Sequence, residues 1–372
     1  MLSLRQRVAS AMVLAIASLV ALPGCASQKE KTPEYVPFPD LSSVGLKKVW
    51  ERQIATAPGE KINSAWRVGD SVYLTTDQAR VIRIEAASGV KAWDTVVGSE
   101  SSHFLRPLEL AGGKEVLVMD RGHFFVINKA TGAVRISKPI GFLATTSPVV
   151  IDNTLCVGGN DYFRGLFLDQ LGGSSWVTVA PQDGFVSDPA VVSNTLIIAS
   201  RDGKLWRVNG EDGNWVWKDR KTNGEVMAGL ATDQHAVFVP SLDHYLYAFD
   251  VNNGGELWNQ RLDGELDQTP VTTKLAGGEL LVVGRGKGLY ALSPADGNVR
   301  WEADGVTQIS SVNGDYVWAG DSSGNLRGIR VDTGEIISST PIAAAQSFIW
   351  SPDEWVIVLN KAGVLDGFVP NR

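Results

Sequence analysis

A unit of about 42 residues that recurs along the chain restricts its fold more than any other feature. Each copy has an apolar residue five positions before a turn glycine and usually a large residue four positions after it, as in Val208, Gly213 and Trp217. The turn glycines stand at positions 89, 132, 172, 213, 254, 297 and 334, so successive copies are 43, 40, 41, 41, 43 and 37 residues apart. One supersecondary unit therefore repeats through most of the chain.

The segments ahead of each turn indicate strands rather than helices. Residues 188–200 (DPAVVSNTLIIAS) and 229–241 (GLATDQHAVFVPS) are rich in β-branched residues and lack the i, i+3, i+4 apolar spacing of an amphipathic helix. The chain also contains 39 glycines and 16 prolines, which suit many short strands joined by turns. A period near 42 is typical of a four-stranded propeller blade, so we predict an all-β propeller.

The two ends of the repeat region predict how the ring closes. Residues 363–368 match the run that precedes each turn, with Phe368 in the place of Val208, while residues 45–50 match the turn and the Trp-bearing strand that follows it. We therefore expect the N-terminal strand to complete the last blade, which removes an open sheet edge. Counting this split copy gives eight blades over a single domain at 44–372, or seven if the degenerate copy around Trp176 is a long insertion.

Residues 1–24 predict a cleaved export signal, because two arginines precede an apolar run from Val8 to Leu22. The sequence Leu22-Pro-Gly-Cys25 resembles the lipobox of bacterial lipoproteins, although a chance cysteine after an ordinary signal is the alternative. The resemblance implies a diacylated Cys25 that anchors the mature protein to a membrane without spanning it. Ala26, in place of an aspartate, implies the outer membrane. Residues 25–43, polar and proline-containing, predict a flexible tether.

Charge and cysteine content exclude several classes of function. Removal of residues 1–24 leaves 32 basic and 41 acidic residues, a net charge of −9, which argues against nucleic-acid binding. Cys156 is the only cysteine besides Cys25, so the lipidated chain has no partner for an internal disulfide. Because Cys156 lies among apolar residues, we expect a buried, unreactive thiol.

The segments YLYAFDVNNGGELW (245–258) and LYALSPADGNVRW (289–301) resemble the pyrroloquinoline-quinone-type propeller repeats. This resemblance implies that the recurring tryptophans and glycines dock neighbouring blades onto one another. The tryptophans in this position are Trp50, Trp93, Trp176, Trp217, Trp258 and Trp301. Quinone-dependent dehydrogenases with these repeats have a vicinal cysteine pair that this chain lacks, so we expect no quinone cofactor.

Catalytic and metal-binding motifs are missing from the sequence. It contains no GxSxG, P-loop or HExxH motif, and its four histidines, at positions 103, 123, 235 and 244, have no metal-ligand spacing. Residues 250–254 (DVNNG) resemble the start of a calcium loop, but the residues that follow do not complete it, so a β-turn is the better interpretation. We therefore predict a protein that is not an enzyme and binds no metal.

The lipobox, tether and eight predicted blades together resemble the BamB-type lipoproteins of the outer-membrane β-barrel assembly machinery, as does the segment 145–159 (TTSPVVIDNTLCVGG). The resemblance implies a scaffold that faces the periplasm and binds the central barrel-inserting subunit. The family's Leu-x-Leu-Arg contact loop falls on Ile140, Phe142 and Leu143, so the apolar character is kept and the arginine is lost. Its second contact, an Asp-x-Asp, falls on Gly184 and Val186 and is missing.

Two other functions stay open. The first alternative is a propeller that binds or senses an extracytoplasmic ligand such as a polysaccharide; the second, more remote, is a quinone-dependent dehydrogenase. Trp215 lies two residues before Trp217, where other copies hold Lys91, Val134, Glu256 and Val299. Because it is not part of the shared pattern, Trp215 is a candidate for partner binding together with Ile140 and Phe142.

Overall fold

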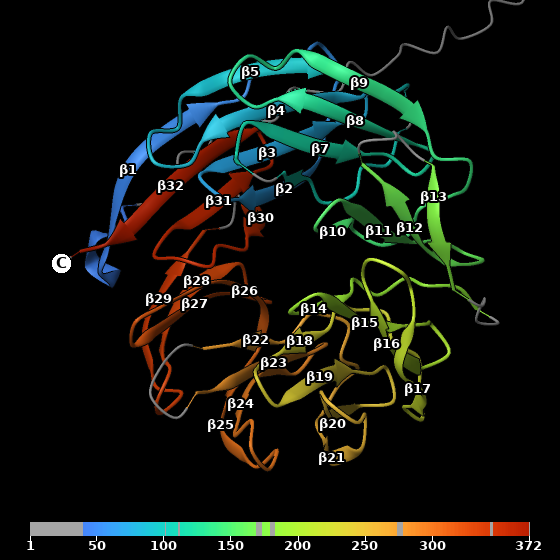
Figure 1. The fold of residues 1–372 in the computed structure, drawn as a ribbon. Coiled ribbons are helices and arrows are strands. Elements are labelled where there is room, and N and C mark those ends of the chain that lie inside the picture. The colour runs from blue at the N-terminus through green and yellow to red at the C-terminus, as the bar shows by residue number, and fades with distance from the viewer. Residues whose placement is uncertain are drawn as a thin grey trace, which may run out of the picture. The chain divides into compact units, whose positions relative to one another are not determined.

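The computed structural model describes residues 40–100, 102–110, 112–168, 173–178, 183–273, 278–342 and 345–371. In these residues the strands pair into eight antiparallel four-stranded sheets arranged as the blades of a propeller (Figure 1). The prediction of eight blades is confirmed, and the seven-blade alternative is wrong because the degenerate third copy forms a sheet of its own. Residues 1–24, Cys25, most of the predicted tether and Gly172 lie outside the described residues.

The first four blades follow one another along the chain. Blade 1 consists of β2 (Ile62–Val68), β3 (Ser71–Thr76), β4 (Arg80–Glu85) and β5 (Lys91–Val96). Blade 2 consists of β6 (Leu108–Glu109), β7 (Glu115–Met119), β8 (His123–Asn128) and β9 (Val134–Pro139). Blade 3 consists of β10 (Val149–Ile151), β11 (Thr154–Gly158), β12 (Phe163–Phe167) and β13 (Ser174–Val177). Blade 4 consists of β14 (Ala190–Val192), β15 (Thr195–Ala199), β16 (Lys204–Asn209) and β17 (Trp215–Lys221).

The other four blades include the one that joins the two ends of the repeat region. Blade 5 consists of β18 (Ala231–Thr232), β19 (Ala236–Pro240), β20 (Tyr245–Asp250) and β21 (Glu256–Arg261). Blade 6 consists of β22 (Val271–Thr272), β23 (Leu280–Gly284), β24 (Gly288–Leu292) and β25 (Val299–Asp304). Blade 7 consists of β26 (Val306–Asn313), β27 (Tyr316–Asp321), β28 (Asn325–Arg330) and β29 (Ile336–Pro341). Blade 8 consists of β30 (Ala345–Ile349), β31 (Val356–Asn360), β32 (Val364–Pro370) and β1 (Leu46–Gln53), with the 3-10 helix η1 (Ser42–Val44) ahead of β1.

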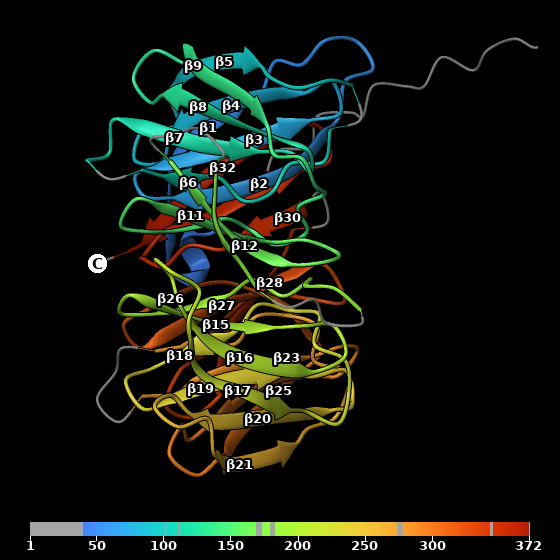
Figure 2. The ribbon, with the colours of Figure 1, turned by 45° about the vertical axis from the view of Figure 1, so that its right-hand side comes forward.

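Within each blade the first strand lies nearest the ring centre and the last at the periphery, as β5, β9 and β21 show in both views (Figures 1 and 2). The second strands, such as β11, β15 and β19, are buried along their whole length. They read as continuous apolar runs because neighbouring blades cover both of their faces. The core is therefore a series of apolar clusters between successive blades rather than one central cluster. Within the described residues, no helix is long and apolar enough to cross a membrane.

Blade 8 closes the ring as predicted. Strand β1 pairs antiparallel with β32, so that Trp50 lies opposite Gly367 and Arg52 opposite Leu365. Leu41, just ahead of η1, is only 2% exposed and packs in the apolar cluster between blades 7 and 8. At least one residue of the range predicted for the tether is thus packed against the propeller.

Each of the six repeat tryptophans donates a hydrogen bond from its indole Nε1 to a backbone carbonyl of the next blade, over 2.7 to 3.0 Å. The six side chains are largely buried; five are 6–8% exposed, and the sixth, Trp258, is partly buried against an apolar cluster. A buried ring contributes a large apolar area, and its only polar atom has a partner. The donors and acceptors are Trp50 and Ala86, Trp93 and Lys129, Trp176 and Gly210, Trp217 and Val251, Trp258 and Pro294, and Trp301 and Val331.

The turn glycine of that next blade lies directly against the indole ring. Gly254, for example, has φ +70°, and a Cβ atom placed on it would lie 2.8 Å from Trp217. The glycine is thus required twice, once for its left-handed backbone and once because the ring leaves no space for a side chain. The same contact joins Gly89, Gly132, Gly213, Gly297 and Gly334 to the tryptophan of the preceding blade.

Blades 2 and 7 lack the docking tryptophan. At blade 2 another apolar side chain takes its position, and at blade 7 a ring from a different strand does so. Blade 2 has Ile136 at this position, packed against the cluster between blades 2 and 3. Blade 7 has Ser338, and no atom lies within 4 Å of a Cβ placed on Gly45, the turn glycine of blade 8. Trp318 stands in the same cross-strand row, because it lies opposite Gly328 and Gly328 lies opposite Ser338. An aromatic ring from the second strand thus replaces one from the outer strand.

Gly254 and Gly45 offer a matched test of the two demands on the turn glycine. Both have positive φ, but only Gly254 faces a ring. We expect Gly45→Ala to lower the free energy of unfolding by about 1–2 kcal/mol from backbone strain alone. Gly254→Ala should cost about 1–3 kcal/mol more, since Trp217 must move. Urea denaturation of both variants measures the difference, and equal losses would show that the ring contact contributes nothing.

The seam that closes the ring contains a buried carboxylate. Asp366 on β32 is fully buried and lies opposite Glu51, with Lys48 Nζ 3.4 Å from its Oδ1 atom and 2.7 Å from Glu51 Oε2. Removal of water from the Asp366 carboxylate raises its pKa to about 6. Because the folded protein holds this proton more tightly than the unfolded chain, the group stabilises most at low pH, and its contribution falls as the pH rises from about 4 through 6.

Asp366→Asn should therefore stabilise the protein at pH 8 by about 1–3 kcal/mol and have little effect at pH 4, since the asparagine has no charge to bury. Chemical denaturation of wild type and variant across this range gives the difference at each pH. Glu335→Gln, at an exposed turn, controls for the change in net charge. A stability difference that is constant with pH would contradict the raised pKa.

Candidate interaction surface

Ile140 and Phe142 lie in the connection between β9 and β10, where the chain passes from blade 2 to blade 3. Both are half-buried and pack against the apolar cluster between those blades. The Ile140 N–H donates to the Gly122 carbonyl over 2.9 Å, which fixes the start of the connection. Leu143, which follows Phe142, has 57% of its surface exposed.

A guanidinium group from the next blade covers the Phe142 ring. Arg164, on β12, has its Cζ atom 4.4 Å from the centre of the Phe142 ring and 5.2 Å from the centre of the Tyr162 ring. Its Nη2 atom donates to Asp161 Oδ2 over 2.9 Å. Because Arg164 lies between two aromatic rings and an acid, it is held in one position while remaining partly exposed. We name Phe142, Leu143, Tyr162 and Arg164 the Phe142 patch.

Local backbone features bring the two segments of the patch together. A Cβ atom on Gly159 would lie 2.8 Å from the Leu143 carbonyl and 3.0 Å from Phe142, so a glycine is required where the connection crosses β11. The Gly159 N–H donates to the Tyr162 carbonyl over 2.9 Å, which closes the β11–β12 turn that exposes Tyr162. Gly141 has φ +75°, which turns the chain just before Phe142. The patch is thus supported by two blades.

Trp215 lies elsewhere. It begins β17, immediately after the β16–β17 turn, whereas the Phe142 patch is formed by a β11–β12 turn and an inter-blade connection. In an antiparallel blade, the turn between the second and third strands lies at one end of the strands and the turn between the third and fourth lies at the other end. The structure therefore does not bring Trp215 together with Ile140 and Phe142. The Trp215 ring, 37% exposed, lies 6.4 Å from Trp206, whose ring is 5.8 Å from Phe185.

Tyr162 and Arg164 were not predicted as site residues from the sequence. The available signal was the run Gly158-Gly-Asn-Asp-Tyr162, in which an aromatic residue stands in a turn rather than in a strand. Arg164 alternates with the buried Phe163 and had no distinguishing pattern. Its position over Phe142 depends on the packing of blade 3 against the β9–β10 connection.

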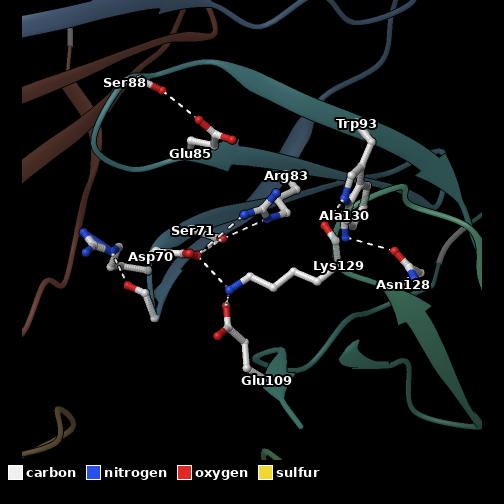
Figure 3. Close-up of polar contacts among 12 residues, drawn as sticks. Asp70, Ser71, Arg83, Glu85, Ser88, Trp93, Glu109, Asn128, Lys129 and Ala130 are labelled. Atoms are coloured by element: carbon white, nitrogen blue, oxygen red, sulfur yellow. Dashed lines mark hydrogen bonds and ion pairs between the residues drawn. The ribbon is translucent and has the colours of Figure 1, made fainter. Parts of the chain in front are cut away.

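A cluster of charged side chains fastens blade 1 to blade 2 (Figure 3). Lys129 Nζ lies 2.8 Å from both Asp70 Oδ1 and Glu109 Oε1, and the Ser71 hydroxyl donates to Asp70 over 2.6 Å. Arg83 Nε donates to Ser71 over 2.8 Å, and its Nη2 atom is 3.6 Å from Asp70. The hydrogen bond from Lys129 lowers the pKa of Asp70 to about 2.

Two acids and two bases balance one another within this cluster. Lys129 also accepts the indole hydrogen bond of Trp93 through its backbone carbonyl, so its side chain and main chain hold the same junction. Because every charged group already has a partner inside the cluster, the arrangement supports blade docking rather than the binding of a substrate.

Two hollows of about 550 and 540 Å³ lie among the inner strands and share Val271, Thr272 and Trp350. Two of the three acids that line them have arginine partners: Asp353 with Arg67 Nη2 at 2.8 Å, and Asp267 with Arg285. Their lining, within the described residues, includes no histidine, cysteine, serine or lysine. No group of three or more possible metal ligands occurs in the part of the chain that the structure describes. Burial raises the pKa of the Cys156 thiol to about 12, so it is not a nucleophile near neutral pH.

A protein-family model described as outer membrane protein assembly factor BamB matches residues 46–137, 138–228 and 220–348. The chain belongs to this family. The BamB protein of Yersinia pestis is 21% identical over 394 residues, which cover 96% of this chain and 98% of that protein. The crystal structure of BamB from Moraxella catarrhalis is similar with a TM-score of 0.67 at 16% identity, covering 87% of this chain and 99% of that one. At this identity the structural match shows the fold alone.

An enzyme also shares part of the repeat region. Tetrathionate hydrolase of Acidithiobacillus ferrooxidans is 24% identical over 168 residues, which are 38% of this chain and 34% of that enzyme. The repeats by themselves therefore do not decide between a BamB protein and an enzyme. The Yersinia relative, which matches nearly the whole chain, is named an assembly factor.

Proposed function

We propose that this protein is a non-catalytic, lipid-anchored scaffold that assists the assembly of β-barrel proteins in the outer membrane. The observation that carries the proposal is the Phe142 patch. Two of its residues, Phe142 and Leu143, lie in the loop that the BamB resemblance assigns to partner contact. Arg164 supplies from β12 the guanidinium that this loop lacks. Arginine and aromatic side chains held rigidly at a surface are the groups that dominate protein–protein binding.

The partner in this proposal is the central barrel-inserting subunit. Leu143 and Tyr162, 57% and 37% exposed, would cover an apolar part of that subunit, and Arg164 would meet an acidic or carbonyl group on it. The second family contact is missing here, because Gly184 and Val186 replace two acids. The Phe142 patch would therefore carry a larger share of the binding free energy in this protein.

Capture from envelope extracts tests the proposal. Phe142→Ala and Arg164→Ala should each reduce recovery of the central subunit by about tenfold, which corresponds to about 1.4 kcal/mol. Trp215→Ala is the matched control, because Trp215 lies at the opposite end of the blade's strands. It should change recovery less than twofold. Unaltered thermal unfolding verifies that each variant folds. Failure of the wild-type protein to recover the subunit, or equal recovery by all variants, would refute this function.

The alternative function, binding of a polysaccharide or another extracytoplasmic ligand, would use the hollow beside Trp350 and Trp355, where Asp353 and Glu354 supply acceptors. Aromatic rings next to carboxylates are groups that a sugar can stack on and hydrogen-bond to. Isothermal titration with envelope glycans distinguishes the two functions, because a scaffold should show no heat of binding.

The lipid anchor is part of the proposal and has its own test. Combined with Arg164→Ala, which weakens the proposed contact with the central subunit, Cys25→Ala should move the protein from the outer-membrane fraction to the soluble periplasm, because the acyl chains would otherwise hold it at the membrane. The unfolding temperature of Cys25→Ala should not change, because Cys25 lies in the predicted tether, outside the predicted propeller domain at 44–372. Continued fractionation with membranes would contradict the anchor.

A further inference from the structure

In the part of the chain that the structure describes, the outer strand of each blade has one edge without a strand partner. Proteins usually protect such edges with charged side chains, short strands or proline. Strands β1, β5, β9, β17, β21 and β25 each carry at least two charged residues, and β13 has only four residues. Strand β29, Ile-Ile-Ser-Ser-Thr-Pro, has six residues and no charge. Among the described outer strands it is thus the least protected of this length.

The side chains of β29 also favour strand pairing. Ile336 and Ile337 are 44% and 45% exposed, and the residues after them are two serines and a threonine. Because successive side chains point to opposite faces, a pairing strand would find an exposed isoleucine on each face of the sheet. The nearby charges lie outside β29: Arg330 ends β28, and Asp332 and Glu335 lie in the turn between the two strands. Pro341 ends β29.

Strand β29 packs against η1 of the next blade without an indole ring between them. Ser338 stands where six other blades have a docking tryptophan, and the space above Gly45 is open. Trp318 Nε1 and Ser338 Oγ are both buried without a hydrogen-bond partner. Less energy is therefore needed for β29 to adjust its twist to an added strand than for an outer strand fixed by an indole ring.

We propose that β29 binds, by strand addition, an extended segment of an unfolded outer-membrane β-barrel protein. The inference rests on the proposed function and adds a second site to it, since β29 and the Phe142 patch belong to different blades. Transmembrane strands alternate apolar and polar residues, and charges on their lipid-facing side are destabilising. Such a segment matches an uncharged edge flanked by isoleucines, whereas a charged segment would lose hydration without gaining a partner.

Peptide binding to the full mature protein tests the inference. The probe is a fluorescent peptide of about ten residues in which uncharged polar and apolar residues alternate, the length of a transmembrane strand. Ile337→Lys should weaken its binding by about tenfold or more, because the edge gains a charge. Leu257→Lys is the matched control: Leu257 is 50% exposed and precedes Trp258 on β21 as Ile337 precedes Ser338 on β29. This control should bind within twofold of wild type.

A second probe, with alternate backbone amides methylated, keeps its side chains but cannot pair along one edge. It should not bind. Equal binding of both peptides, or equal binding by wild type and Ile337→Lys, would overturn the inference.

Sedimentation tests whether a second copy of the protein occupies β29 instead. A wild-type dimer that Ile337→Lys dissociates, with no peptide binding, would assign β29 to self-association. Ile337→Lys should still capture the central subunit, so loss of peptide binding alone leaves the scaffold proposal standing.

Discussion

The hydrogen bond from an indole nitrogen to a backbone carbonyl of the next blade is the interaction on which the propeller depends. A four-stranded blade cannot bury both of its faces alone, so the fold exists only if each sheet is held against the next. The tryptophan does this with one side chain, because its ring covers the neighbouring turn while its N–H removes the polar cost of burial. The glycine beneath it is the necessary counterpart, since Gly254 and its equivalents have neither the backbone angles nor the space for a side chain.

Because the tryptophan and glycine contacts hold the blades together, most surface loops are not needed for blade docking. Loops between blades can change without disturbing the junctions, which explains how the Phe142 patch can be built from a β9–β10 connection and a turn of blade 3. Where a junction departs from the pattern, neighbouring residues compensate. At blade 7 the aromatic ring moves from the outer strand to Trp318, and the outer strand β29 is left with serine. Serine in place of tryptophan at position 338 therefore changes both the packing between blades 7 and 8 and the exposed edge of β29.

The candidate site was only partly predictable. Ile140 and Phe142 could be located because the connection that contains them matches the contact loop of the BamB family. Arg164 could not, since an arginine within a strand has no distinguishing sequence pattern. Conversely, Trp215 was singled out because it departs from the repeat, and the structure separates it from the other candidates. A residue that departs from the repeat shows that one blade differs from the others. It does not indicate which other residues lie near it in the fold.

The sequence by itself determined the repeat period and the order of the blades, the position of the docking tryptophans and glycines, and the closure of the last blade by β1. These follow from spacing, because a regular repeat must place equivalent residues at equivalent junctions. The choice of eight blades over seven came from the structure, in which the degenerate third copy forms its own sheet. Only the tertiary structure decided that Arg164 lies over Phe142, that Asp366 is buried at the closing seam, and that β29 is an uncharged edge next to a junction without an indole. Each of these depends on contacts between residues of different strands or blades, and no local pattern in a single sequence records such contacts.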